Sequence, residues 1–194
     1  MDNQTRSEIS RKKAIDAALG ILARDGVGGL TFDSLSRESG ISKGGLLHQF
    51  RTKQGVLKAL LEFQQQRFEE IARAYLANEG ASKAEPTLSS QIAIYREAIN
   101  QPNSVARAVL AAIIESPDLL EDRKAATADK LKALEKESDD IELSLLRYFA
   151  ASGIAFNVLL GLTPLSGAMQ GRLFARLLDD ESWKSPATKR KARK

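Results

Sequence analysis

The chain has 194 residues, of which 43% are hydrophobic and 28% are charged, proportions that are typical of a globular protein. It contains no cysteine, which excludes disulfides and thiolate metal sites and fits a reducing cytoplasm. No apolar run approaches the roughly 18 residues of a membrane span, and the N-terminus lacks an apolar signal core, so we expect neither membrane insertion nor secretion.

The net charge of +4 comes from the C-terminal end of the chain. Residues 184–194 contain six basic residues and no acidic one, which leaves 23 basic and 25 acidic residues, a net charge of −2, for the rest. Bulk charge is therefore poor evidence for nucleic-acid binding, which has to be argued from particular residues. We expect the basic tail, residues 181–194, to be disordered, and its role stays open.

Helical periodicity runs through nearly the whole chain, whereas no sustained strand-like alternation is present. The first helix is expected over about residues 7–25, with Ile15, Ala18, Leu19 and Leu22 on one face and Gly26 as its C-cap. The sequence therefore predicts an all-α fold.

Two short helices joined by a tight turn follow. Thr31 is a good N-cap for a helix over Asp33–Ser39, and Ser42 is one for a helix over Lys43–Gln49, with Gly40 in the turn between them. Three helices with such a turn between the second and the third describe a helix-turn-helix unit. In such a unit the last helix, here Lys43–Gln49, enters the major groove of DNA.

The remainder of the chain continues in helices. Thr52 is expected to cap a long helix that ends near Asn78, and residues 78–90 form the clearest linker, with Gly80 and Pro86. Further helices are expected over residues 88–100, 103–115, 118–137, 139–161 and 166–179. We expect about nine helices in all, as an N-terminal three-helix helix-turn-helix domain (residues 1–52) and a helical ligand-binding and dimerisation domain (residues 53–180).

The stretch TFDSLSRESGISKGGLLHQFRTKQGVL, residues 31–57, resembles the DNA-binding signature of the TetR/AcrR family of bacterial transcriptional regulators. The positions that match in register are Thr31, Leu35, Gly40, Ile41, Ser42, Lys43, Gly44, Leu46, Phe50, Lys53 and Leu57. With the first helix the likeness covers about residues 9–60, and beyond them it is one of architecture only. The resemblance implies a cytoplasmic, homodimeric, ligand-responsive regulator that is not an enzyme, and it favours a repressor.

The resemblance also implies a set of DNA contacts. Thr31 and Ser42 would donate to phosphates at helix starts, and Lys53 would reach a phosphate from the next helix. The expected DNA-binding residues are Thr31, Ser34, Ser42, Lys43, Gly44, Gly45, His48, Gln49 and Lys53. Leu46 and Phe50 are expected to be core residues that hold the recognition helix against its neighbours.

Two adjacent glycines stand in this short helix, although each costs about 1 kcal/mol relative to alanine. Without side chains at Gly44 and Gly45 the backbone can lie close to DNA. Gly45 departs from the threonine or alanine that is frequent in the family at this position, and it cannot read a base. Ser36 and Ser39 stand where alanine is usual, and each hydroxyl can bond to the carbonyl four residues earlier.

The resemblance implies dimerisation through the last two long helices, and the first of them has apolar residues on more than one face. The expected dimer residues are Leu145, Phe149, Phe156, Leu160, Met169, Leu173, Phe174 and Leu177. An effector of unknown identity would bind a cavity lined by Phe68, Tyr75, Tyr95, Arg96, Arg107, Ile113, Phe156 and Asn157, each of which could equally belong to the core.

Effector binding would favour a dimer state whose recognition helices are wrongly spaced for DNA, with the helix from residue 53 to 78 as the connector. No cofactor or metal is expected, because His48 is the only histidine and has no suitable partners near it in sequence. The operator sequence and the target genes cannot be derived from the chain.

Two alternatives to a regulator differ in their support. An enzyme on a helical scaffold has none, because the sequence lacks a nucleophile–base pair, a metal cluster and a phosphate-binding loop. A protein-interaction scaffold with a degenerate helix-turn-helix is favoured by Gly45 and by the nearly neutral body of the chain. DNA binding at low salt would separate that scaffold from a regulator.

Overall fold

The computed structural model describes residues 3–100, 110, 113 and 118–183 of the chain. Every element of regular structure in these residues is helical, which confirms the predicted fold class. The helix expected over residues 103–115 lies almost wholly outside the described residues, and so do Arg107 and the tail beyond Trp183. The chain divides into two compact units: unit 1 comprises Met1–Arg67 and Pro102–Arg123, and unit 2 comprises Phe68–Gln101 and Lys124–Lys194.

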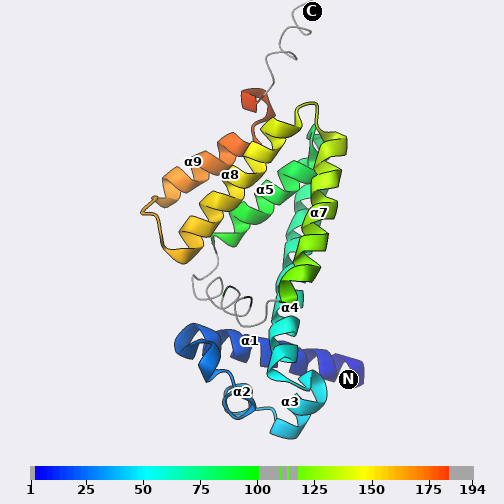
Figure 1. The fold of residues 1–194 in the computed structure, drawn as a ribbon, viewed down its shortest axis with the longest axis vertical. Coiled ribbons are helices and arrows are strands. Elements are labelled where there is room, and N and C mark those ends of the chain that lie inside the picture. The colour runs from blue at the N-terminus through cyan, green and yellow to red at the C-terminus, as the bar shows by residue number, and fades with distance from the viewer. Residues whose placement is uncertain (1–2, 101–109, 111–112, 114–117, 184–194) are drawn as a thin grey trace, which may run out of the picture. The chain divides into compact units, whose positions relative to one another are not determined.

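Unit 1 contains α1 (Asn3–Gly29), α2 (Phe32–Ser39), α3 (Lys43–Phe50) and the first part of α4 (Lys53–Ala77) (Figure 1). The first helix is longer than expected, since it begins at Asn3 and resumes for about one turn after Gly26. Gly26 has φ 68° and ψ −173°, which interrupts the helix at the position expected to end it. Glycine adopts this backbone conformation at no steric cost.

The core of unit 1 holds the two short helices in place. Leu35 of α2 is 1% exposed, and Leu46 and Phe50 of α3 are 0% and 5% exposed. They belong to a cluster with apolar residues of α1 and α4, among them Ala14, Ala18, Ile21, Leu22, Val56, Leu57 and Leu60. Burial of one such side chain contributes about 1.5–3 kcal/mol, so packing stabilises α3 against the cost of its glycines.

The elements of unit 2 are likewise helical. They are the second part of α4, the 3₁₀ turn η1 (Gly80–Ser82), α5 (Pro86–Ala98), most of α7 (Leu119–Glu137), α8 (Ile141–Leu160), α9 (Gly167–Leu178) and the 3₁₀ turn η2 (Asp180–Trp183).

The linker expected over residues 78–90 is shorter in the structure. Pro86 is the first residue of α5 and does not break the helix, because a residue at this position has an N–H without an intrahelical acceptor in any case. The bounds of α8 and α9 lie within two residues of those expected. Ser166 caps α9 as expected, with its Oγ accepting from the Met169 N–H at 3.3 Å.

Helix α5 is central to unit 2, where it contacts both α8 and α9 (Figure 1). Leu88 and Ile92 of α5 are fully buried in one cluster with Phe174 of α9, which is also 0% exposed. The other buried members of this cluster are Tyr75, Ala93, Leu134, Tyr148, Ala151, Ala155, Leu177 and Leu178. The C-terminal unit therefore has a core of its own.

Helix α8 corrects the expectation that no segment has the length and composition of a membrane span. An 18-residue window of α8 has a mean hydropathy of 1.5, and 28% of that window is buried. A search for uninterrupted apolar runs misses this segment because Glu142 and Arg147 interrupt its apolar residues. Core helices of water-soluble proteins pass the same test, so one such helix is weak evidence for a membrane.

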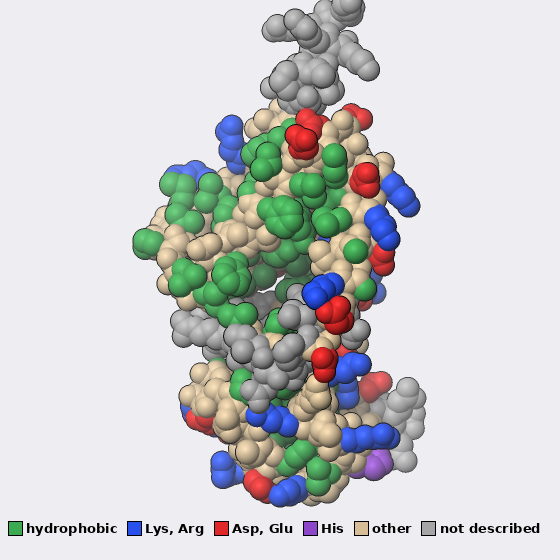
Figure 2. All heavy atoms as spheres, viewed as in Figure 1, with side chains coloured by type: hydrophobic (Ala, Val, Ile, Leu, Met, Phe, Trp, Pro, Cys, Tyr) green, Lys and Arg blue, Asp and Glu red, His purple; other side chains and the backbone are tan. Residues whose placement is uncertain are grey.

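The low burial of α8 reflects an apolar surface on unit 2. Figure 2 shows hydrophobic side chains gathered over α8 and α9, with charged side chains bordering them along α7. The large exposed apolar residues are Leu146 (65%), Phe149 (59%) and Phe156 (53%) of α8, and Leu162 (64%) just after it. Large exposed apolar surfaces are typical of protein–protein or membrane contacts and of ligand-binding grooves.

Candidate nucleic-acid interface

A reciprocal cap fixes the start of α2. The Ser34 N–H donates to Thr31 Oγ1 and the Thr31 N–H donates to Ser34 Oγ, both at 3.0 Å. The Ser34 hydroxyl in turn donates to the Gly29 carbonyl at 2.7 Å. Thr31 is exposed and Ser34 is only partly so, which makes Thr31 the more accessible of these two expected DNA contacts.

Two serines fix the turn between α2 and α3. Gly40 ends α2 in the left-handed conformation (φ 71°, ψ 11°), and its N–H donates to the Ser36 carbonyl at 3.0 Å. Ser39 Oγ donates to the Leu35 carbonyl at 2.6 Å, four residues earlier, as expected. Ser36 differs from the expectation, since its Oγ donates forward to the Ile41 carbonyl at 2.6 Å. This forward bond stabilises the turn and leaves the helix ladder intact.

One side of α3 faces the rest of unit 1. Leu46 and Phe50 enter the core, and Ser42 caps the helix by accepting from the Gly45 N–H at 3.2 Å. The Gln49 Nε2 donates to the Ser7 carbonyl of α1 at 3.4 Å, and its Oε1 is buried. Gln49, expected to contact DNA, is therefore directed toward α1.

The opposite side of α3 is exposed. Lys43, Gly44, Leu47 and His48 lie on it, at the spacing that places residues on one face of a helix. Leu47, which is 40% exposed, was not among the residues expected to contact DNA, since of the apolar residues in this helix only Leu46 and Phe50 were given a role, in the core. We call these four residues the outward face of α3.

The two glycines of α3 differ in their surroundings. An added Cβ at Gly45 would lie 3.3 Å from Ile41 Cγ2 and from Ser42 Oγ, a tight contact with the turn and with the cap. An added Cβ at Gly44 would meet no heavy atom within 4 Å. Packing within the chain thus accounts for Gly45, whereas no described residue accounts for Gly44.

Lys43 is paired across the turn. Its Nζ lies 2.8 Å from Asp33 Oδ1 in the first turn of α2, where the helix dipole favours a carboxylate. The two side chains are 53% and 74% exposed, so the pair contributes little stability and its ammonium can exchange to a phosphate.

Hydrogen bonds from Arg24 of α1 to Asp25 and to Glu38 of α2 raise the pKa of the Arg24 guanidinium.

The turn from α3 to α4 requires a glycine that the sequence analysis did not single out. The Gly55 N–H donates to Thr52 Oγ1 at 3.0 Å, which makes Thr52 the expected cap of α4. An added Cβ at Gly55 would lie 2.0 Å from the Phe50 carbonyl oxygen, an impossible approach. Lys53, the first residue of α4, is partly exposed beside this turn.

The residues expected to line an effector cavity are only partly brought together. Tyr75 is 6% exposed, and the Arg96 guanidinium lies 6.0 Å from the centre of its ring. Burial raises the pKa of the Tyr75 phenol. Tyr95 donates from its hydroxyl to that of Tyr148 at 3.2 Å, a residue of the same core.

Other expected cavity residues lie elsewhere. Phe68 is partly buried in unit 2, and Ile113 packs against the core of unit 1. Phe156 is 53% exposed. The exposed Asn157 donates from Nδ2 to the Gly153 carbonyl of its own helix at 2.8 Å, so it faces no cavity of unit 2 described by the structure.

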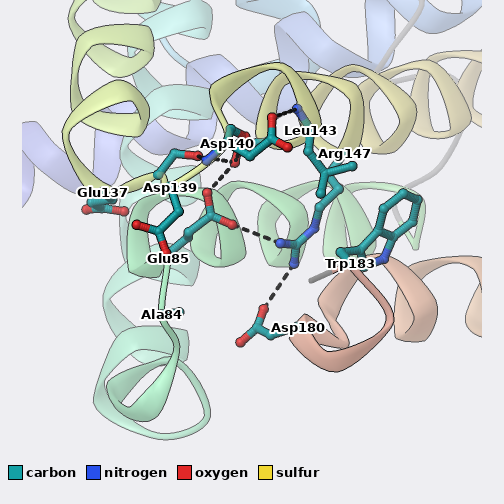
Figure 3. Close-up of a pocket in the computed structure, with 11 residues that line it drawn as sticks. Ala84, Glu85, Glu137, Asp139, Asp140, Leu143, Arg147, Asp180 and Trp183 are labelled. Carbon is teal, nitrogen blue, oxygen red and sulfur yellow. Dashed lines mark hydrogen bonds and ion pairs between the residues drawn. The ribbon is translucent and has the colours of Figure 1, made fainter. Parts of the chain in front are cut away.

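A cavity of about 240 Å³ in unit 2 is lined by the buried Arg147 of α8 together with Glu85, Asp180 and Trp183 (Figure 3). The side chain of Arg147 is 4% exposed, and its Nη1 lies 2.9 Å from Glu85 Oε2 and its Nη2 3.1 Å from Asp180 Oδ1. Its Nη2 also donates to the Leu177 carbonyl at the end of α9, at 2.8 Å. Arg147 thus joins the start of α5 to the end of α9 and was not singled out in the sequence.

The expected dimer residues fall into two groups. Phe149 and Phe156 are more than half exposed, and Leu145, Leu160, Met169 and Leu173 are partly exposed. Phe174 and Leu177 are 0% and 5% exposed in the core of unit 2 itself. These two residues, expected to contact a second copy of the chain, therefore pack within their own unit.

The short capped helices, the locked turn and the exposed side of α3 define a helix-turn-helix DNA-binding protein. Residues 14–60 match the family model described as "Bacterial regulatory proteins, tetR family". Residues 72–180, more than half of the chain, match "Tetracyclin repressor-like, C-terminal domain". The chain belongs to the TetR family, and it is a DNA-binding transcriptional regulator and not an enzyme.

Solved structures resemble the chain over most of its length. The multidrug binding protein EbrR complexed with imidazole has a TM-score of 0.61 and 20% identity, over 96% of this chain and 94% of that one. A TetR family member from Streptomyces coelicolor A3 has a TM-score of 0.65 and 19% identity, over 88% and 98%. The fatty acid degradation regulator FadR from Bacillus halodurans has a TM-score of 0.63 and 15% identity, over 90% and 97%. At such low sequence identities the likeness to these structures shows the fold alone. A comparison with curated protein sequences finds no match.

Proposed function

We propose that this protein is a homodimeric repressor of the bacterial cytoplasm, which binds operator DNA through α3 and releases it when a small organic effector binds. The observation that carries the proposal is the outward face of α3, where Lys43 and His48 flank Gly44, a position whose missing side chain no packing in the described part of unit 1 explains. A helix without a side chain there can bring its backbone against the edges of base pairs. Two such helices in a dimer would bind the two half-sites of a roughly palindromic operator.

The expected contacts take different roles in this proposal. Lys43 and His48 contact phosphates or base edges from α3, and Lys53 contacts a phosphate from the start of α4. Thr31 and Ser42 contact phosphates at helix N-termini, where the backbone N–H groups favour an anion. Gln49 positions α3 against α1 through its bond to Ser7, and we assign it no contact with a base.

Dimerisation is proposed to cover the apolar surface of α8. Phe149 and Phe156, more than half exposed, lie seven residues apart, on the same side of the helix. Sedimentation should show a dimer for the wild-type chain and a monomer for Phe149→Glu. Ala126→Glu, which adds the same charge to an exposed position of α7, should remain a dimer. A dimer in both variants would contradict this interface.

The effector is proposed to bind within unit 2. Its binding would affect the DNA-binding unit through α4, a helix that contributes residues to both units. Related proteins support a small organic effector, since one is described as a multidrug binding protein and another as a fatty acid degradation regulator. A ligand that prefers the DNA-free state shifts the equilibrium by its difference in affinity, typically about 1–3 kcal/mol.

Selection of genomic fragments tests the proposal. The purified full chain is incubated at low salt with sheared bacterial DNA, and bound fragments are sequenced and then competed with a library of small organic compounds. We expect a shared, roughly palindromic site and at least one compound that releases it. Absence of binding to any fragment would contradict the regulator and favour a protein-interaction scaffold with a degenerate helix-turn-helix.

A further inference from the structure

Leu47 is the one large apolar side chain on the outward face of α3. It is 40% exposed, whereas Leu46, its neighbour in sequence, is fully buried in the core of unit 1. The same helix therefore has an apolar residue that is fully buried on its inner side and another that is 40% exposed on its outer side.

The surroundings of Leu47 extend its reach. A long side chain on a helix leans toward the N-terminus and covers the surface one turn before its own Cα. For Leu47 that turn contains Gly44, which has no side chain and open space around it. We therefore expect the side chain of Leu47 to lean toward this turn, beside the place where the backbone of α3 can approach DNA most closely.

The chemistry of the major groove restricts what such a side chain can contact. Adenine, guanine and cytosine present hydrogen-bond donors and acceptors there, whereas thymine also presents a C5-methyl group. A leucine pressed against polar base edges leaves them without partners, at a cost in free energy. Leucine offers a phosphate no hydrogen bond either.

We propose that Leu47 contacts a thymine C5-methyl group in each operator half-site and makes thymine the preferred base at that position. The inference rests on the proposed function, since it requires α3 to lie in the major groove of an operator. Lys43 and His48, beside Leu47 on the same face, supply polar contacts, and Leu47 adds selectivity for one base.

Removal of a single methyl group from DNA tests the proposal. In the selected operator, each thymine is replaced in turn by deoxyuridine, which lacks only the C5-methyl group and pairs in the same way. For the wild-type chain, we expect one position per half-site at which the replacement weakens binding about fourfold, the effect of one methyl group, and about 15-fold when both half-sites are replaced. For Leu47→Ala, the same replacements should have no further effect.

Two variants complete the experiment. Ile9→Ala is the matched control, because Ile9 of α1 is 41% exposed and should leave the deoxyuridine effect unchanged. Leu47→Gln should shift the preferred base from thymine to adenine at the same position, since glutamine pairs with the adenine N6 and N7. Circular dichroism should show that each variant keeps the helical content of the wild-type chain, as expected for exposed positions.

The outcomes are distinct. The wild-type chain could bind its operator specifically and yet show no loss of affinity with deoxyuridine, or lose as much as Leu47→Ala does. Either result would overturn this inference and leave the proposed function standing. Failure of the wild-type chain to bind any fragment would overturn the proposed function and this inference with it.

Discussion

The polar contacts that shape the turn between α2 and α3 join residues that are close in sequence, whereas those of Arg147 and Lys83 in the C-terminal unit join residues that are far apart. In unit 1, Ser39 bonds to a carbonyl 4 residues away and Lys43 pairs with a carboxylate 10 residues away. In unit 2, Arg147 pairs with Glu85 at a separation of 62 residues, and Lys83 donates to the Leu178 carbonyl at 95.

This difference has a physical consequence. Local bonds form whenever the segment is helical, so the turn between α2 and α3 keeps its shape through several contacts of about 1 kcal/mol each. The bonds of Arg147 exist only when α5, α8 and α9 are packed together, and its charge is buried. Losing one partner of a buried pair costs more than losing one exposed cap. Unit 2 should therefore respond strongly to single changes, and the turn in unit 1 only weakly.

The largest expected effect is that of Arg147→Met. It leaves Glu85, Asp180 and the Leu177 carbonyl without their guanidinium, and we expect the free energy of unfolding to fall by about 3–5 kcal/mol. Urea denaturation followed by circular dichroism measures the change. Arg172→Met, at an exposed position of α9, is the control and should change stability by no more than about 0.5 kcal/mol. Equal losses in the two variants would contradict the role assigned to Arg147.

Gly55→Ala is the exception expected in unit 1, because it acts on the backbone. The added Cβ would lie 2.0 Å from the Phe50 carbonyl oxygen, so the turn between α3 and α4 has to move. We expect a loss of about 3 kcal/mol, at the upper end of the usual cost of overpacking. The same denaturation experiment measures it, and a stability equal to that of the wild-type chain would show that the turn differs from the one described.

The serines of the turn between α2 and α3 should affect stability much less than Arg147 does. Ser36→Ala and Ser39→Ala each remove a hydroxyl that donates to a carbonyl at 2.6 Å, and each should cost about 1 kcal/mol. Thermal or urea unfolding of the single and double variants measures the losses. A loss above about 3 kcal/mol in either single variant would break the contrast between the two units.

The smallest expected effect concerns the pair of Lys43 and Asp33. Asp33→Asn frees the ammonium for a phosphate and Lys43→Ala removes it, so the plot of log K for DNA against log salt should be steeper for Asp33→Asn than for Lys43→Ala by about 0.9 per chain, with the wild-type chain between the two. Glu38→Gln removes one negative charge from the same helix and is the control. Because the Glu38 carboxylate lies 3.3 Å from Arg24 and not beside Lys43, this variant should keep the slope of the wild-type chain. Equal slopes for Asp33→Asn and Lys43→Ala would remove Lys43 from the interface.

The sequence predicted the parts of the molecule that follow local rules. The N-cap roles of Thr31, Ser42 and Ser166 and the break at Gly26 depend on neighbours within a few residues. For Ser36 the sequence suggested the carbonyl four residues earlier as an acceptor, whereas the conformation of the turn brings the Ile41 carbonyl to its hydroxyl.

The features that were not predicted depend on tertiary packing. The burial of Arg147 requires two carboxylates that are 62 and 33 residues away from it. The exposure of Leu47 follows from the side of α3 that Leu46 and Phe50 occupy in the core, which only the tertiary packing determines. The different reasons for Gly44 and Gly45 became visible only when the space around each was known.

Gly44→Ala tests most directly the claim that the outward face of α3 lies against DNA. The free chain should become more stable by up to about 1 kcal/mol, because alanine is the better helix former and the added Cβ meets nothing within 4 Å. Affinity for the selected operator, measured by fluorescence anisotropy, should nevertheless fall about tenfold, the size of one good base contact. An unchanged affinity in a stabilised chain would contradict the account.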